Sequence, residues 1–224
     1  MEGPPGLKLN PYELTRREQN LLILIIILFH VVGLVGFAVP ALQPFFIKLV
    51  PWHILLMLIV ILCSHRPIER KLIVFALLIF ISGIILEWLG VHKNWVFGNY
   101  TYGSTLGFKL DAIPLIIGVN WFLLIYSAGV LMQRTRIRSL FFRVIIGAAI
   151  LVLLDLLIEP VARRYDYWHW TNNSVPLKNY SDWFFVSAAM LFAFEQFRFK
   201  RQGIVAPVLL VVQFVFFAVL WLMG

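Results

Sequence analysis

Long apolar runs alternate with short polar segments along the whole chain. Each run resembles a membrane-spanning helix, which needs about 20 mainly apolar residues to cross the hydrocarbon core of a bilayer. The sixth run is the weakest of the series. The pattern predicts an all-α polytopic membrane bundle of about seven transmembrane helices. The predicted spans are Asn20–Val39, Phe45–Cys63, Leu72–Leu89, Ile113–Gln133, Leu140–Glu159, Trp183–Phe197 and Ile204–Met223.

Composition supports a membrane protein with a single domain. Hydrophobic residues make up 61% of the 224 residues, against about 45–50% in soluble domains. The first apolar run is too long for a signal-peptide core, and no small-residue cleavage pattern follows it. We therefore expect an N-terminal cytoplasmic tail over residues 1–19 and one transmembrane helical domain over residues 20–224.

Basic residues predict the orientation of the bundle in the membrane. The net charge of +8 does not indicate nucleic acid, because Lys and Arg form small groups between apolar runs instead of one solvated stripe. Thirteen of the nineteen fall on one side of the predicted bundle. The positive-inside rule then places the N-terminus in the cytoplasm and the C-terminus outside, which requires an odd number of spans and supports the weak sixth one.

The two longest connections are predicted to share the extracytoplasmic face. They cover Gly90–Ala112 and Pro160–Asp182, and both are rich in Gly, Asn, Trp and Tyr. Each begins just after a carboxylate, because Glu87 closes the third span while Asp155 and Glu159 lie in the last part of the fifth. These two segments hold most of the informative chemistry of the chain.

The three carboxyl groups are the candidate catalytic residues. An ionisable group inside a span costs about 2.5–3.5 kcal/mol at the helix centre, so each is a functional candidate by default. The spacing of four puts Asp155 and Glu159 on one helix face. Two buried carboxyls so placed disfavour each other's ionisation, which favours one protonated acid at neutral pH. The alternatives are a structural hydrogen bond from Asp155 to another helix, for instance to Asn120, a position in water for Glu159 and an interfacial position for Glu87.

Aromatic residues gather on the same predicted face. Each of them fits the belt that anchors helices at lipid headgroups. Their clustering on one face also indicates a pocket whose π-faces stabilise a cationic intermediate. The residues expected to bind substrate are Trp95, Tyr100, Tyr102, Asn120, Trp168, Trp170, Asn179 and Trp183.

No cofactor or metal is predicted. His92 and His169 lie beside the aromatic residues, but two histidines without a clear carboxylate spacing are a weak metal signal. The Asp155 to Glu159 pair is similar to half of a magnesium-diphosphate site, yet a second acidic cluster is lacking. Retinal is excluded because the last span, Ile204–Met223, contains no lysine for a Schiff base.

Several short strings together resemble a known family. They are Trp95-Val-Phe-Gly98-Asn-Tyr100-Thr-Tyr102, Asp155-Leu-Leu-Ile-Glu159-Pro160, Tyr167-Trp168-His-Trp170 and Pro176-Leu-Lys-Asn179-Tyr180 with Trp183. Their order and spacing resemble the integral-membrane carotenoid biosynthesis proteins, which include bisanhydrobacterioruberin hydratase and the γ-carotene 1′-hydratases.

The resemblance implies a carotenoid 1,2-hydratase of the cell membrane. Such an enzyme adds water across the C1–C2 double bond of an acyclic carotenoid end group by acid catalysis and needs no redox cofactor. Its partner is a carotenoid of the lycopene or γ-carotene type within the bilayer, with association with other carotenoid enzymes a further expectation. We expect Asp155 or Glu159 to donate the proton and Glu87 or the partner carboxylate to orient the water.

Two other functions remain open from the sequence. A carotenoid cyclase would protonate the same end group and close a ring instead of capturing water. A non-enzymatic carotenoid-binding or transport protein would also use buried carboxyls and an aromatic pocket. Only the product separates these alternatives.

Overall fold

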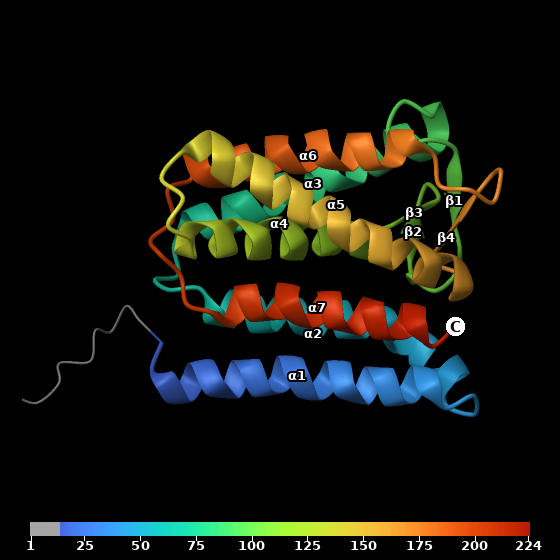
Figure 1. Cartoon of the computed structure of the whole chain (residues 1–224), viewed down its shortest axis with the longest axis horizontal. Helices are drawn as coiled ribbons and strands as arrows, with labels where there is room; N and C mark the ends of the chain where they lie inside the picture. Colours follow the sequence, from blue (N-terminus) through green and yellow to red (C-terminus); the bar gives the residue numbers. More distant parts are fainter. Residues whose placement is uncertain (1–13) are drawn as a thin grey trace, which may run out of the picture.

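Seven helices lie side by side along the long axis of the molecule in the computed structural model, which describes residues 14–224 (Figure 1). Successive helices run in opposite directions, so the chain crosses the bundle from end to end at each step. The helices are α1 (Arg16–Ala38), α2 (Gln43–Ser64), α3 (Arg70–Lys93), α4 (Ile116–Arg134), α5 (Leu140–Arg164), α6 (Leu177–Gln196) and α7 (Val205–Leu222).

All seven predicted helices are present, which confirms the helical fold. Six of them are long and apolar enough to cross a membrane, and α6 is not one of these six, so the chain has the architecture of a multi-pass membrane protein. Most boundaries shift by a few residues, and two shift the most. Helix α5 continues through Pro160 to Arg164, and α6 begins at Leu177, well before Trp183.

The first helix begins at a capping box. The Thr15 hydroxyl accepts a hydrogen bond from the Glu18 N–H at 3.2 Å, and the Glu18 carboxylate accepts one from the Thr15 N–H at 2.8 Å. These two bonds satisfy donors that a helix start leaves unpaired. Residues 16–19 of the predicted tail are therefore helical, and residues 1–13 of that tail lie outside the described residues.

Helix α4 forms the centre of the bundle. It packs against α2, α3, α5, α6 and α7, and most of its side chains are buried. Gly118 lies against Phe80 of α3 and Gly129 against Phe194 of α6, with no room for a β-carbon at either position. In contrast, α1, α2 and α3 expose many Leu, Ile, Val and Phe side chains, which is the surface that lipid tails cover.

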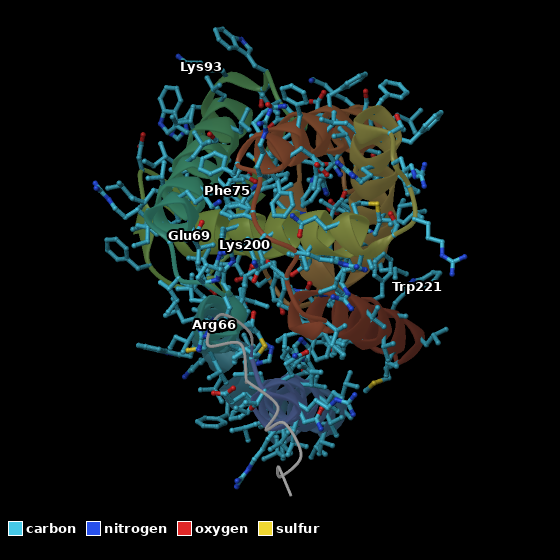
Figure 2. The ribbon with its side chains drawn as sticks, turned by 90° about the vertical axis from the view of Figure 1, so that its left-hand side faces the viewer. Arg66, Glu69, Phe75, Lys93, Lys200 and Trp221 are labelled. Carbon is cyan, nitrogen blue, oxygen red and sulfur yellow. The ribbon has the colours of Figure 1, made fainter. Side chains whose placement is uncertain are left out.

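Two short antiparallel ribbons lie at one end of the bundle (Figure 1). Strand β1 (Tyr100–Tyr102) pairs with β4 (Trp168–Trp170), and β2 (Lys109–Leu110) pairs with β3 (Ile113–Pro114). The structure thus brings the two long connections to the same end, as predicted, although the strands themselves were not predicted. The opposite end carries Arg66, Glu69 and Lys200 in the helix connections (Figure 2).

Candidate active site

The β1–β4 ribbon turns four aromatic side chains toward the helices. Tyr100 pairs with Trp170 and Tyr102 with Trp168, and side chains two residues apart in a strand share one face. The outward residues between them, Thr101 and His169, are exposed. The alternating strings Tyr-Thr-Tyr and Trp-His-Trp therefore build one inner aromatic face.

Strand β1 supplies two hydrogen-bond donors to Glu87 of α3. The Tyr100 hydroxyl and the Tyr102 hydroxyl, the latter at 2.7 Å, both donate to Oε2. The Trp121 indole of α4 donates to Oε1 at 2.9 Å, and the Glu87 side chain is only 4% exposed. Burial and the adjacent Glu87 raise the pKa of both tyrosines well above 10, so each hydroxyl keeps its proton and donates.

Strand β4 supplies indole donors to Glu159 of α5. The Trp170 Nε1–H donates to Oε2 at 2.8 Å, and the Trp168 Nε1–H lies 3.3 Å from both carboxylate oxygens. The alternative that Glu159 sits in water is therefore wrong in this structure, since its side chain is buried. Glu87 thus accepts hydrogen bonds from two residues of β1, and Glu159 accepts them from two residues of β4.

Asp155 lies one helical turn below Glu159 and is completely buried. The side-chain amide of Asn179 on α6 joins the two acids, because its Nδ2 lies 2.8 Å from Asp155 Oδ2 and 3.4 Å from Glu159 Oε1. The expected face shared by Asp155 and Glu159 is confirmed, but the partner of Asp155 is Asn179 and not Asn120. Asp155 Oδ1 is buried without a hydrogen-bond partner.

A small cavity of about 30 Å³ lies between Glu87 and Glu159. Such a volume accommodates one or two water molecules among several polar partners. On one side the Trp121 and Trp183 rings stack with centroids 4.3 Å apart. The lining residues are Glu87, Phe97, Tyr100, Tyr102, Ile117, Asn120, Trp121, Ile158, Glu159, Trp168, Trp170, Asn179 and Trp183.

A second, apolar cavity of about 350 Å³ adjoins the first. It lies between α1, α2 and α7 on one side and α4, α5 and the β4 strand on the other. The two cavities share a wall made by Ile117, Asn120, Ile158 and Trp168. The volume is typical of sites for small apolar ligands. The cavity with the buried carboxyls therefore shares a wall with a cavity large enough for a ligand.

Comparison with known proteins identifies the family. A family model described as "Carotenoid biosynthesis protein" matches residues 48–224, most of the chain. The chain belongs to the carotenoid biosynthesis protein family. The bisanhydrobacterioruberin hydratase of Haloarcula japonica is 30% identical over 146 residues, which cover 61% of this chain and 49% of that protein. The chain thus spans about half the length of this relative, and no solved structure matches it.

Most of the predicted site residues meet at the small cavity of this carotenoid biosynthesis protein. Asp155 lies behind it, in contact with Asn179. Trp95 lies apart, because its side chain is 69% exposed and its carbonyl accepts a hydrogen bond from Lys178 at 2.9 Å. His92 and His169 each pair with an aspartate, at 3.5 Å with Asp111 and 2.6 Å with Asp166 respectively. No group of three His, Cys, Asp or Glu residues able to hold a metal occurs within residues 14–224.

One aromatic lining residue, Trp121, was missed by sequence reasoning. Trp121 and Phe97 both face the small cavity, and their rings stack with centroids 6.0 Å apart. Trp121 lies inside an apolar span, where a tryptophan gives no pattern of its own. A tryptophan inside a span is nevertheless a usable signal, since its buried N–H needs an acceptor.

Asp166, outside the cavity, links the two connections that carry the β1 and β4 strands. Its carboxylate accepts hydrogen bonds from the Ser104 N–H at 2.7 Å and the Ser104 hydroxyl at 2.6 Å. These bonds, together with His169, lower the pKa of Asp166 to about 2. Because Ser104 follows β1 and Asp166 precedes β4, this contact holds the two long connections together.

Proposed function

We propose that this carotenoid biosynthesis protein is a hydratase that adds water to the C1–C2 double bond of an acyclic carotenoid end group. The observation that carries the proposal is the shared wall between a water-sized cavity with two carboxyls and a large apolar cavity. Hydration needs an acid, a water molecule and an alkene at one point. This junction offers a place for each of them.

The Asp155–Glu159 pair is the proposed proton donor. Neither acid has an ion pair with a cation among the described residues, and two adjacent buried carboxylates are costlier than Glu87, which stands alone with three donors. A single proton shared by the pair avoids two adjacent buried charges. Glu159 lines the cavity and delivers the proton to C2 of the alkene, while Asp155, with its unpaired Oδ1, holds the proton behind it.

Glu87 is the proposed partner of the water. An ionised carboxylate offers about four lone-pair sites, and the tyrosines and Trp121 occupy three. The remaining site accepts a proton from water as its oxygen bonds to the cation at C1. The π-faces of Trp121 and Trp183 stabilise the positive charge in the meantime. One proton enters at C2 and one leaves the water, so the net change is the addition of H2O.

The carotenoid end group is proposed to occupy the large cavity, with the rest of the polyene in the bilayer. The reaction is neither an oxidation nor a reduction, so it needs no redox cofactor. A water-sized space beside the acids favours hydration over cyclisation, because ring closure requires that the folded end group itself fill the reacting position.

The orientation and the seventh span extend this proposal. Helix α6 runs the length of the bundle beside α3 and α5 (Figure 1), and we propose that it crosses the cell membrane with the other six. The N-terminus then lies in the cytoplasm, and the site faces outward. A periplasmic-face reporter fused after Gly224 is expected to be active, whereas a well-expressed but inactive fusion would overturn this orientation.

The experiment is expression in a bacterial host that accumulates lycopene or γ-carotene, followed by mass spectrometry of the extracted pigments. Hydration gives a product heavier by one water with nearly unchanged polyene absorption. An isomer of unchanged mass and blue-shifted absorption would instead identify a cyclase. Asp155→Asn is expected to abolish the product while the protein stays in the membrane, and Asp111→Asn, an exposed position outside both cavities, is the matched control.

A further inference from the structure

Asn120 of the central helix α4 lies on the wall that the two cavities share. The other residues of this wall are the apolar Ile117 and Ile158 and the indole of Trp168, whose N–H already donates to a carboxylate. Ile117, Asn120 and Leu124 follow one another at spacings of three and four, so they share one face of the helix, and all three line the large cavity. The amide therefore lies where the proposed water and the proposed alkene meet.

The Asn120 side chain is the only carboxyl, amide or hydroxyl group in the lining of the small cavity that makes no hydrogen bond within residues 14–224. Both lining carboxyls, the two tyrosine hydroxyls and the Asn179 amide each make at least one. An amide carries a carbonyl acceptor and two N–H donors, and a polar group inside an apolar helix is costly unless it is paired. Asn120 is thus suited to bind a small polar molecule, and a cavity of about 30 Å³ has the size for water.

We propose that Asn120 holds the attacking water, so that this amide decides whether the carotenoid cation is hydrated. The inference rests on the proposed function and adds a residue to its mechanism. A water that attacks C1 must keep a lone pair free for the new bond, so it is best oriented through its two hydrogens. Glu87 accepts one hydrogen, and the Asn120 carbonyl Oδ1 accepts the other. The water oxygen then faces the alkene in the large cavity.

The other polar groups of the small cavity are less suited to this place. The indoles only donate, so each of them would occupy a lone pair of the water. The Tyr100 and Tyr102 hydroxyls are turned toward Glu87, and Asn179 is bonded to the two acids of α5. Among the lining groups, Asn120 Oδ1 is therefore the acceptor that is left beside Glu87.

Loss of the Asn120 amide separates protonation of the alkene from capture of the cation. Glu159 still transfers a proton to C2, and the cation at C1 still forms. Without an oriented water, C2 returns a proton to the ionised Glu159, and the C1–C2 double bond is restored. In D2O the added proton is a deuteron. When the carbon then gives back its original hydrogen, the failed capture leaves deuterium on C2 of the recovered carotenoid.

The test uses the full chain in proteoliposomes in D2O, loaded with lycopene or γ-carotene. Mass spectrometry measures the hydrated product and the recovered carotenoid that carries deuterium, at early times before the product can revert. We expect the ratio of hydrated to deuterated carotenoid to fall about 10-fold in Asn120→Leu, the size of one buried hydrogen bond. The sum of the two, which reports protonation, should stay within about 2-fold of the wild type.

Two further variants separate the role of the amide from a role in packing. Asn120→Asp keeps the size of the side chain and an accepting oxygen, and it should bring the ratio back to within about 3-fold of the wild type. Val119→Ala changes the neighbouring residue of α4, which lines neither cavity, and this matched control should retain the ratio. A purely structural role of Asn120 would lower hydration and deuteration together, because less folded protein protonates less carotenoid.

The inference and the proposed function fail in different ways. A wild-type ratio in Asn120→Leu, or hydration and deuteration that fall together in this variant, would overturn the role of Asn120 and leave the hydratase function standing. A wild-type protein that forms no hydrated product and puts no deuterium into the recovered carotenoid would overturn the proposed function, and the role of Asn120 with it.

Discussion

The two strands of the β1–β4 ribbon hold the two cavity carboxyls with different chemistry. On the β1 side, the hydroxyls of Tyr100 and Tyr102 bind Glu87. On the β4 side, the indoles of Trp168 and Trp170 bind Glu159. A hydroxyl donates and also accepts, whereas an indole N–H only donates. The two halves of one ribbon therefore give their carboxyls different routes for a proton.

The difference is consistent with the opposite roles proposed for the two acids. The hydroxyl partners of Glu87 can accept as well as donate a hydrogen bond, which suits the proposed role of receiving a proton from the substrate water. A proton on Glu159 cannot pass to an indole, so it leaves only toward the cavity or toward Asp155. A carboxyl held by indoles and a carboxyl held by hydroxyls on opposite sides of one small cavity suit the proposed acid and base roles.

Between the two cavity carboxyls, the largest expected effect is from Glu159→Gln. The amide still accepts from the indoles but cannot donate an acidic proton, and general-acid catalysis is worth about 10²–10⁴-fold. Hydrated carotenoid per amount of membrane-inserted protein should fall by at least 100-fold. Glu69→Gln, at the opposite end of the bundle, is the matched control and should keep full activity. Retention of a third of the activity would remove Glu159 from the donor role.

Glu87→Gln should have the second largest effect, about 10–100-fold on product formation. The loss is smaller because a tertiary cation reacts with neutral water, so the base assists the step without being indispensable. The same pigment assay measures it. A ranking in which Glu87→Gln is more damaging than Glu159→Gln would exchange the two roles.

Substitutions of the ribbon residues that donate to Glu87 and Glu159 give a finer test of the difference between the two strands. Tyr102→Phe removes a 2.7 Å hydrogen bond to Glu87, and Trp168→Phe removes a longer one, shared between two oxygens at 3.3 Å. We expect activity to fall about 10-fold in the first variant and about 2-fold in the second. Equal losses would show that the two halves of the ribbon do not differ in strength.

Asp166→Asn should have the smallest effect, on stability instead of chemistry. Because the pKa of Asp166 is lowered to about 2, from about 3.9 in an unfolded chain, its carboxylate stabilises the fold above about pH 4. This stabilisation is lost as the pH falls toward 2. Half of the side chain is exposed, so the variant should melt only about 1–3 °C lower at pH 7. Thermal scans at pH 7 and pH 2.5 test this, and an equal difference at both would contradict it.

The helices were predictable because a helix surrounded by lipid or by other helices needs a long apolar run, which is visible in the sequence. The ribbon was missed because strings of three residues carry little local signal, although Tyr-Thr-Tyr and Trp-His-Trp do alternate with a period of two. The early start of α6 was missed as well, because Lys178, Asn179 and Asp182 make its first turns polar. Without those turns on the helix, Asn179 had no predictable place beside Asp155.

The site was predictable in its residue types but not in its pairings. Glu87, Asp155 and Glu159 stood out because carboxyls are rare within spans. Their partners depend on how α3, α5 and α6 are rotated about their axes, which the sequence of each helix does not record. His30 and His53 showed no pattern for the same reason, since they meet only through the packing of α1 against α2.

The central position of α4 has a consequence for the biogenesis of the protein. Helix α4 precedes α5, α6 and α7 in the chain, so during synthesis it enters the bilayer before three of its five neighbours exist. Lipid must cover those faces first and be exchanged for protein later. Lipid tails are as apolar as leucine, so this exchange depends on close packing. At Gly129 that packing is against Phe194 of α6. Replacing Gly129 with a larger residue should therefore impair the late packing of α6 against α4 more than the insertion of α4 into the membrane.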